Sequence, residues 1–260
     1  MQRTPVSIAL AQFPAALQPL LSGAQVYDSS CSPHAKVYFI DKDGGFYLKT
    51  APKGTLATEA AVTEFFHQKG LSAEVLAYLQ EEKDFFLTRR IPGEDCIDSR
   101  YLADPNRLAE TTGQLLRQLH EIDPTGCPIN RTESYLATAR KNYEECAYEA
   151  DLFPDNWGYR TPEDAWAVVQ EFAPELKIDT LIHGDYCLPN ILLEDWRFSG
   201  FIDLDSGGLG DKHIDLFWGA WTLQFNLKTD RWCSTFLDAY GREAFDGEIL
   251  KAIAAFEVFG

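Results

Sequence analysis

Basic residues are scarce in this sequence of 260 amino acids. Lys and Arg number 23 against 40 Asp and Glu, which gives a formal net charge of −17. A surface of this sign repels nucleic acid and anionic membrane, so we expect neither as a partner, and it favours a cationic ligand. Many soluble proteins are acidic for solubility alone, so the charge by itself leaves both interpretations open.

The sequence also lacks paired cysteines and long apolar runs. Its six cysteines form no C-x-x-C pair, which indicates neither a zinc site nor a disulfide framework, and we expect a reducing cytoplasm. No apolar run reaches membrane-spanning length. Near the start, Gln12, Pro14 and Gln18 interrupt the apolar residues and no A-x-A site follows, so we expect a short amphipathic helix rather than a signal peptide.

The first third of the chain carries strand signals. Aromatic and aliphatic residues alternate on both sides of the Asp-Gly-Gly sequence at 43–45, which predicts a β-hairpin over residues 36–50. Residues 58–70 have a helical composition and end in glycine, which is typical of a helix C-terminus. Two further strands are predicted around the charged turn that precedes the Pro-Gly pair at 92–93.

Beyond that pair the pattern is mainly helical. Asp104 and Pro105 form an N-cap followed by a first-turn proline, and leucines then recur on one helical face. Further helices are predicted over about 133–150, over 162–172 and from residue 231 onward.

These elements predict an α+β protein with two lobes. The smaller lobe, residues 1–90, is expected to be an antiparallel β structure with one helix. The larger lobe, residues 91–260, is expected to be mainly helical, with the Pro-Gly pair as the hinge between the two.

The segment "LIHGDYCLPNILL" places polar residues inside an apolar run. It contains H-x-D-x-x-x-x-N, from His183 through Asp185 to Asn190. Protein kinases carry this pattern in their catalytic loop, where the Asp accepts the proton of the attacking hydroxyl and the Asn holds Mg²⁺. Phosphoryl transfer needs both functions, and one loop can present them. A polar loop between two strands is the alternative interpretation of this pattern alone.

Three more polar positions follow the order found in kinases. Asp203 ends an apolar strand 13 residues after Asn190, as the second metal-binding carboxylate of kinases does. Lys49 ends a predicted strand and Glu59 lies in the next helix; in kinases such a Lys grips the nucleotide phosphates and such a Glu aligns it. Each residue alone is more often a solvated charge, but the ordered set predicts a nucleotide-dependent kinase.

The sequence resembles the aminoglycoside phosphotransferases, and within them the 3'-phosphotransferases that inactivate kanamycin and neomycin. The matching stretches span almost the whole chain: "SPHAKVY", "YLK", "LLRQLHEID", "NW", "HGDYCLPNILLEDWRFSGFID" and "FEVF". The resemblance implies a protein-kinase-like fold and transfer of the γ-phosphate of ATP or GTP, with Mg²⁺, to a hydroxyl of a cationic aminoglycoside. It implies a cytoplasmic antibiotic-resistance enzyme that acts as a monomer or a homodimer.

The resemblance also implies roles for the polar positions. Asp185 would be the catalytic base for the sugar hydroxyl, and Asn190 and Asp203 would bind magnesium. Lys49 would hold the nucleotide phosphates, with Glu59 as its partner.

For the rest of the nucleotide site, the loop from Ser32 to Ala35 resembles the phosphate-covering loop of the family. Tyr47 is similar to the aromatic residue that stacks on adenine. Backbone groups from Arg89 to Ile91 would line the hinge.

In the acceptor site, Asp155, Glu257 and Asp205 are the carboxylates expected to receive the ammonium groups of the drug. Three positions depart from the pattern of relatives, which carry an acid or arginines there: Gly158, Ser206 and Trp221.

Two other functions are compatible with these residues. The departures in the acceptor site fit a kinase of the same fold that phosphorylates choline, an amino-alcohol or another metabolite. A pseudoenzyme that binds a nucleotide or a cation without turnover is the third hypothesis. Against it, the four polar residues that kinases use for phosphoryl transfer are all present: Lys49, Asp185, Asn190 and Asp203.

Overall fold

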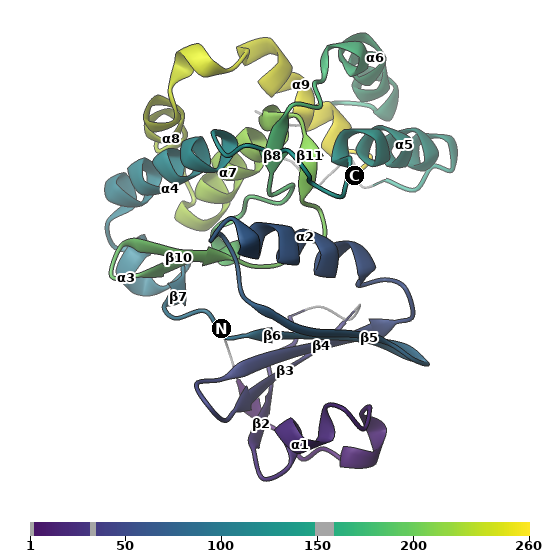
Figure 1. The fold of residues 1–260 in the computed structure, drawn as a ribbon. Helices are drawn as coiled ribbons and strands as arrows, with labels where there is room; N and C mark the ends of the chain where they lie inside the picture. The colour runs from purple at the N-terminus through teal and green to yellow at the C-terminus, as the bar shows by residue number, and fades with distance from the viewer. Residues whose placement is uncertain (1–2, 32–34, 149–158) are drawn as a thin grey trace. The chain divides into compact units, whose positions relative to one another are not determined.

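The computed structural model describes residues 3–31, 35–148 and 159–260. The chain forms two compact units: unit 1 consists of residues 1–95 and 191–205, and unit 2 consists of residues 96–190 and 206–260. The α+β class is confirmed, because unit 1 is built on antiparallel sheets and unit 2 is mainly helical (Figure 1). The division into lobes at residues 90 and 91 stays a prediction. No helix in the described part of the chain is long and apolar enough to span a membrane.

Unit 1 contains a six-stranded antiparallel sheet in the order β1-β2-β3-β4-β6-β5. Its strands are β1 (Thr4–Pro5), β2 (Gln25–Asp28), β3 (Lys36–Asp41), β4 (Phe46–Pro52), β5 (Val75–Gln80) and β6 (Lys83–Arg89). The predicted hairpin over 36–50 is confirmed as β3 and β4. Its turn needs three residues with positive φ, which the Asp-Gly-Gly sequence at 43–45 supplies.

The two faces of this sheet are covered differently (Figure 1). On one face, Phe46 and Leu48 of β4 are buried in a cluster with Phe13, Leu17 and Leu21 from the N-terminal segment. Side chains alternate along a strand, so the next residues of β4 point to the opposite face. That face carries helix α2 (Ala57–Gln68), the helix predicted there.

The prediction of one amphipathic helix at the N-terminus is wrong. The segment instead contains strand β1, a 3-10 turn η1 (Leu10–Gln12) and a single-turn helix α1 (Gln18–Leu21). Proline at positions 5 and 14 explains the difference, because proline lacks an amide hydrogen and keeps the preceding residue out of the helical region.

A second, three-stranded sheet completes unit 1, in the order β10-β9-β7. Its strands are β7 (Glu94–Asp95), β9 (Ile191–Glu194) and β10 (Arg197–Phe201). Asp195 and Trp196 join β9 to β10 with φ of 50° and 68°. Two successive positive φ values are typical of the tight turns that suit the twist of a hairpin.

Unit 2 is mainly helical, with one small sheet formed by β8 (Thr180–Ile182) and β11 (Gly208–Gly210). Its helices are α3 (Ser99–Leu102), α4 (Pro105–His120), α5 (Arg131–Glu144), α6 (Pro162–Phe172), α7 (Lys212–Leu227), α8 (Cys233–Tyr240) and α9 (Gly247–Glu257), with 3-10 turns η3 (Ala173–Glu175), η4 (Leu188–Asn190) and η5 (Arg242–Ala244). The predicted cap of α4 is confirmed, because the Asp104 side chain accepts from the Arg107 amide. The predicted helix over 162–172 is confirmed as α6, whereas α5 ends at Glu144.

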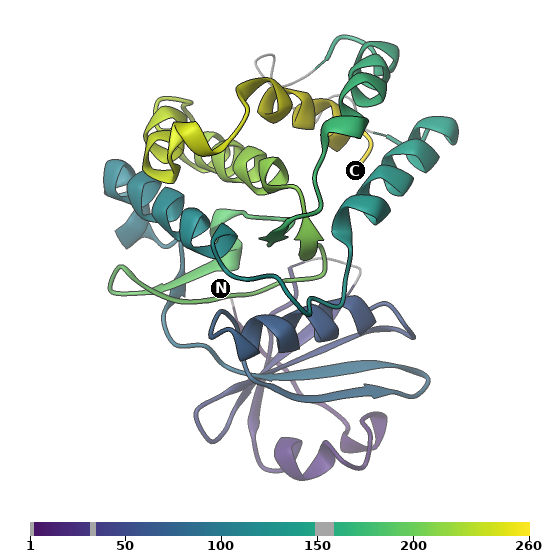
Figure 2. The ribbon, with the colours of Figure 1, turned by 45° about the horizontal axis from the view of Figure 1, so that its top comes forward.

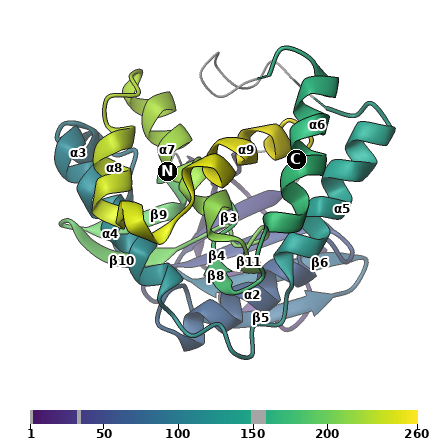
Figure 3. The same ribbon diagram turned by 90° about the horizontal axis from the view of Figure 1, so that it is seen from above.

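Helix α7 lies at the centre of unit 2, where it packs against α4, α8 and α9 (Figures 2 and 3). Two glycines permit this close packing. A Cβ at Gly219 of α7 would lie 2.3 Å from the Phe236 ring, and one at Gly113 of α4 would lie 2.4 Å from the Phe236 carbonyl oxygen.

The strands on either side of the polar segment do not pair with each other. β8 pairs with β11 in unit 2, whereas β9 pairs with β10 and β7 in unit 1. The polar residues 183–190 therefore follow a buried strand of unit 2 and end where the chain enters unit 1.

Candidate active site

The 183–190 loop holds two of the predicted site residues in direct contact. Asn190 Nδ2 donates to Asp185 Oδ2 at 2.8 Å and to the Asp185 carbonyl oxygen at 3.0 Å. An ionised carboxylate only accepts hydrogen bonds, so the amide nitrogen of Asn190 must face it and Oδ1 must point elsewhere. Asn190 is buried and Asp185 is half-buried. The loop thus presents an acceptor-only carboxylate and a fixed amide oxygen.

Gly184 is required by the close approach of another segment to this loop. Its φ is +80°, and a Cβ there would lie 1.8 Å from the carbonyl oxygen of Ser206. Any other residue would push the loop away from Ser206. The residue before Asp185 is therefore fixed by backbone packing.

A buried carboxylate on α7 anchors the start of the loop. Asp215 is 0% exposed, and its two oxygens accept from the amides of His183 and Gly184, each at 2.7 Å. Its Oδ2 also lies 3.1 Å from His120 Nε2, whose ring Nδ1 lies 2.9 Å from the Tyr240 hydroxyl. A carboxylate cannot donate, so Nε2 of His120 carries the proton.

Helix α7 holds the end of the loop as well. Thr222 is buried, and its hydroxyl accepts from the Leu188 amide at 3.1 Å. Sequence reasoning missed both anchors, Asp215 and Thr222. The only signal for Asp215 was an acid among apolar residues in "HIDLFW", and such an acid is buried only when it has hydrogen-bond donors.

In unit 1, Lys49 forms ion pairs with two predicted site residues. Its Nζ lies 2.8 Å from Glu59 Oε2 and 3.2 Å from Asp203 Oδ1. Burial lowers the pKa of Lys49, but the charges of Asp203 and Glu59 outweigh it and raise the pKa overall. The ammonium group stays charged and is held at a fixed point, which suits binding of an anion such as a phosphate.

Two acids beyond the end of β10 lie near this lysine. Asp203 has φ of 54° and a side chain that is 56% exposed, and Asp205 is also exposed. Leu204 between them is 0% exposed and anchors the segment. The negative charge of Asp205 acts on Lys49 and Glu59. The structure therefore groups Asp205 with the lysine of unit 1.

The remaining nucleotide-site predictions lie in unit 1 or outside the described residues. Tyr47 shares the α2 face of the sheet with Lys49; its ring lies 5.2 Å from Phe39, and its hydroxyl accepts from Arg3. Arg89 ends β6 and bonds to Glu74, and Ile91 packs over Gly200. Ala35 is half-buried beside the cluster of residues 51, 56, 60 and 86. Ser32 and Asp155 lie outside the described residues.

Glu257 ends α9 in unit 2 and is 9% exposed. Its Oε1 accepts from the Tyr135 hydroxyl at 2.8 Å, and its carboxylate also accepts from the Trp218 side chain. Burial raises the pKa of Glu257 to about 7, although the two hydrogen bonds oppose the rise, and the charge of Asp185 adds to it. A carboxylate with such a pKa is at least half ionised only at neutral pH and above.

This raised pKa predicts a pH dependence of stability. The folded protein binds the Glu257 proton more tightly than the unfolded chain, whose pKa is about 4.5, so the stabilisation is complete below pH 4.5 and is lost as the pH rises through 7. Relative to Glu257→Gln, the wild type is expected to lose on the order of 3 kcal/mol of unfolding free energy from pH 4.5 to 8. Urea unfolding at each pH measures the difference, and parallel profiles would contradict the raised pKa.

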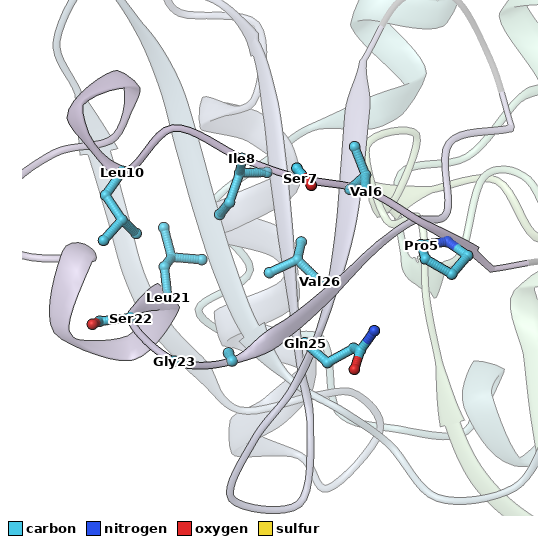
Figure 4. Close-up of a pocket in the computed structure, with 11 residues that line it drawn as sticks. Pro5, Val6, Ser7, Ile8, Leu10, Leu21, Ser22, Gly23, Gln25 and Val26 are labelled. Carbon is cyan, nitrogen blue, oxygen red and sulfur yellow. The ribbon is translucent and has the colours of Figure 1, made fainter.

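A pocket of ≈ 620 Å³ lies elsewhere in unit 1, between the N-terminal segment and β2 (Figure 4). Its lining includes Val6, Ile8, Leu10, Leu21 and Val26. No ionisable side chain and no predicted site residue lines it. It is unsuited to phosphoryl transfer, because its lining offers no carboxylate and no lysine.

Among the described residues, no group of three or more His, Cys, Asp and Glu side chains is placed to hold a metal ion. This finding excludes a zinc-type cage in that part of the chain. Mg²⁺ does not need such a cage, because it is usually held by one or two protein oxygens together with waters and substrate phosphates. The amide oxygen of Asn190 and the carboxylate of Asp203 are ligands of the type it prefers.

Comparison with known proteins identifies the family of this chain. The profile of the phosphotransferase enzyme family matches residues 25–253, so this chain belongs to that family. Within it, the chain is similar to a probable aminoglycoside 3'-phosphotransferase of Lactococcus lactis subsp. lactis (strain IL1403). The two are 46% identical over 255 residues, which are 97% of each chain. An aminoglycoside 3'-phosphotransferase of Niallia circulans is 27% identical, and the match covers 88% of this chain and 86% of that relative.

Solved structures share the fold. The crystal structure of a type VIII aminoglycoside-3'-phosphotransferase matches with a TM-score of 0.76 and 22% identity, covering 94% of this chain and 97% of that chain. A Streptomyces rimosus aminoglycoside phosphotransferase in complex with ADP and streptomycin matches with a TM-score of 0.68 and 24% identity, covering 86% and 91%. The kinase-like fold inferred from the sequence is confirmed.

Proposed function

We propose that this protein transfers the γ-phosphate of ATP to the 3'-hydroxyl of an aminoglycoside and so confers resistance to the antibiotic. The observation that carries the proposal is the 183–190 loop, in which Asp185 is half-buried and held by Asn190. The similarity to a probable aminoglycoside 3'-phosphotransferase across 97% of the chain supports the acceptor class. The net charge of −17 favours such a polycationic substrate.

Each polar residue has a role in this proposal. Asp185 accepts the proton of the acceptor hydroxyl, and Lys49, aligned by Glu59, holds the phosphates of the donor. The backbone around Arg89 to Ile91 and the ring of Tyr47 hold the adenine, while Ala35 and the loop before it cover the phosphates. On the acceptor side, Glu257 receives an ammonium group in its ionised form.

Magnesium is part of the same proposal. Asn190 and Asp203 supply its protein oxygens, and the ion neutralises charge on the phosphates when it is bound. The donor is ATP or GTP, and the enzyme acts in the cytoplasm as a monomer or a homodimer. Asp205 is proposed, with Asp155 and Glu257, to receive an ammonium group of the acceptor.

The function is tested by following ADP release from Mg-ATP in a coupled assay. Kanamycin, neomycin, a 3'-deoxy aminoglycoside and choline are compared with no acceptor. We expect stimulation by kanamycin and neomycin only, because the 3'-deoxy compound lacks the accepting hydroxyl. Stimulation by choline alone would replace the proposal with a metabolite kinase, and silence with every acceptor in a protein that binds nucleotide would refute it.

Asp203→Asn is expected to weaken magnesium-dependent nucleotide binding at least about tenfold, because the substitution removes a charged oxygen ligand. The matched control is Asp195→Asn, an exposed acid of unit 1 with nearly the same backbone conformation, φ of 50° against 54°. Calorimetric titration with ATP, with and without Mg²⁺, measures both variants. Equal magnesium dependence in the Asp203 variant and the control would show that Asp203 is no ligand.

A further inference from the structure

Three aromatic side chains form a continuous row along α7. Trp218, Trp221 and Phe225 recur at intervals of three and four residues, so they share one face of the helix. The rings of Trp218 and Trp221 are 5.3 Å apart and edge to face, and those of Trp221 and Phe225 are 4.9 Å apart and nearly parallel at 11°. We call these three residues the aromatic row.

The aromatic row is partly open to solvent. Both tryptophans are half-buried, and Phe225 is 54% exposed, more than any other large hydrophobic residue in the described part of the chain. Core packing explains apolar residues that are covered, such as Phe217 at 0% exposure. It does not explain the stacked rings of Trp221 and Phe225, because the first is only half-buried and the second is exposed, and contiguous rings left open to solvent are typical of a binding surface.

The row lies beside the residues that hold the 183–190 loop. Asp215 and Thr222, which accept from backbone amides of that loop, are three residues before and four residues after Trp218. At 3.6 residues per turn, Trp218 lies about 60° or less around the helix from either anchor. The Trp218 side chain donates to Glu257 on α9, the helix packed against α7 (Figure 3), and the charge of Asp185 acts on that carboxylate. The row thus begins beside Glu257, an acid predicted to bind the acceptor, and continues along α7 to Phe225.

The chemistry of the row suits a ligand that is both cationic and partly apolar. Lys228, which ends α7 with φ of 58°, folds back so that its ammonium lies 4.3 Å from the centre of the Phe225 ring. The row therefore already accommodates one ammonium group against a ring face, which the negative face of an aromatic ring attracts. The C–H groups on the flat face of a sugar ring also pack on aromatic rings, through dispersion.

We propose that the aromatic row is a subsite for the acceptor, with Trp221 as the residue that determines acceptor range. The inference rests on the proposed function, because it concerns the substrate of the same site. The ligand is an aminoglycoside: one aminosugar ring stacks on Trp221 while an ammonium group reaches Glu257 beside Trp218. The remaining ring or ammonium lies along Phe225, where it competes with Lys228.

The test compares Trp221→Ala, Trp221→Phe and Phe225→Ala with the wild type, with kanamycin and Mg-ATP varied in turn. Trp221→Ala is expected to raise the KM for kanamycin at least about tenfold and to change the KM for ATP less than twofold. Trp221→Phe, which keeps a ring, is expected to stay within threefold of the wild type. Phe225→Ala is expected to raise the kanamycin KM about threefold. Trp232→Ala is the control, because Trp232 is a half-buried tryptophan outside the row that carries a similar cation contact, from Arg231.

A second readout does not depend on turnover. Kanamycin added without nucleotide is expected to quench the tryptophan fluorescence of the wild type and of Trp232→Ala, and to quench Trp221→Phe much less. If the wild type phosphorylates kanamycin while Trp221→Ala keeps the wild-type KM and folds normally, the subsite is refuted and the function stands. If the wild type phosphorylates no aminoglycoside, the proposed function fails. Choline turnover that is lost in Trp221→Ala would then assign the row to another cation and overturn the aminoglycoside subsite.

Discussion

Asp185→Ala is expected to lower the turnover number about 10³-fold while the affinity for Mg-ATP stays within twofold of the wild type. A positioned base contributes about 10²–10⁴-fold to a proton transfer, and the half-buried carboxylate of Asp185 is the acceptor-only group that Asn190 orients. Lys49 and Glu59, which are proposed to hold the nucleotide, lie in unit 1 and keep their contacts. Steady-state kinetics with kanamycin and calorimetric titration with ATP give the two quantities.

Asp185→Asn separates the charge of this residue from its shape. The amide has the same size but cannot take up a proton, so its turnover is expected to be as low as that of the alanine variant. Turnover within tenfold of the wild type in either variant would remove Asp185 from the proton-accepting role. A loss of ATP affinity parallel to the loss of turnover would indicate a folding defect instead, which thermal unfolding would detect.

Asp215→Ala is expected to have the largest effect on stability, a loss of about 2–5 kcal/mol of unfolding free energy. The substitution leaves the amides of His183 and Gly184 without their acceptor in a site that is fully buried, and it also removes the partner of His120. Turnover is expected to fall at least tenfold under conditions where the variant is folded, because the start of the 183–190 loop loses its anchor. Urea unfolding and kinetics below the unfolding transition measure the two effects.

Two variants make this prediction specific. Asp215→Asn keeps the shape of the side chain but can accept from only one of the two amides. Its unfolding free energy is therefore expected to lie between that of the wild type and that of Asp215→Ala. Asp238→Asn removes an exposed acid of α8 that is paired with Arg242, the first residue of η5, and such surface pairs contribute less than about 1 kcal/mol. An Asp215→Ala protein as stable as Asp238→Asn would mean that water replaces the carboxylate.

The elements of the fold were largely predictable from local sequence. The Asp-Gly-Gly turn, the N-cap Asp104 and the glycine after α2 are signals that act over a few residues, and the hairpin, α4 and α2 appear where these signals predict them. The N-terminal segment was not predictable in this way. Its apolar residues suggested a helix, but they are used to cover one face of a sheet that the rest of unit 1 provides.

The candidate site, like the fold, contains residues that local sequence predicted and residues that it did not. Asp185, Asn190, Lys49 and Asp203 were found because the order and spacing of these polar residues reflect the chemistry of phosphoryl transfer. Asp215 was missed because its partners are backbone amides 31 and 32 residues away, and no spacing records a contact between a helix and a distant loop. Trp221 was identified as a departure from the family pattern, but its place in a row of stacked rings became visible only once α7 was built.

The chain passes between the two units three times, after Asp95, Asn190 and Asp205. A protein cut after Asp95 would therefore yield an N-terminal fragment whose short strand β7 has lost β9, its partner in the sheet, and a C-terminal fragment that carries the β9–β10 hairpin without the rest of unit 1. Neither fragment contains the whole three-stranded sheet, so restoring that sheet requires that the hairpin of the C-terminal fragment pair with β7 of the N-terminal fragment. This connectivity makes position 95 suitable for a fragment-complementation reporter, in which survival on the antibiotic signals that two fused proteins have met.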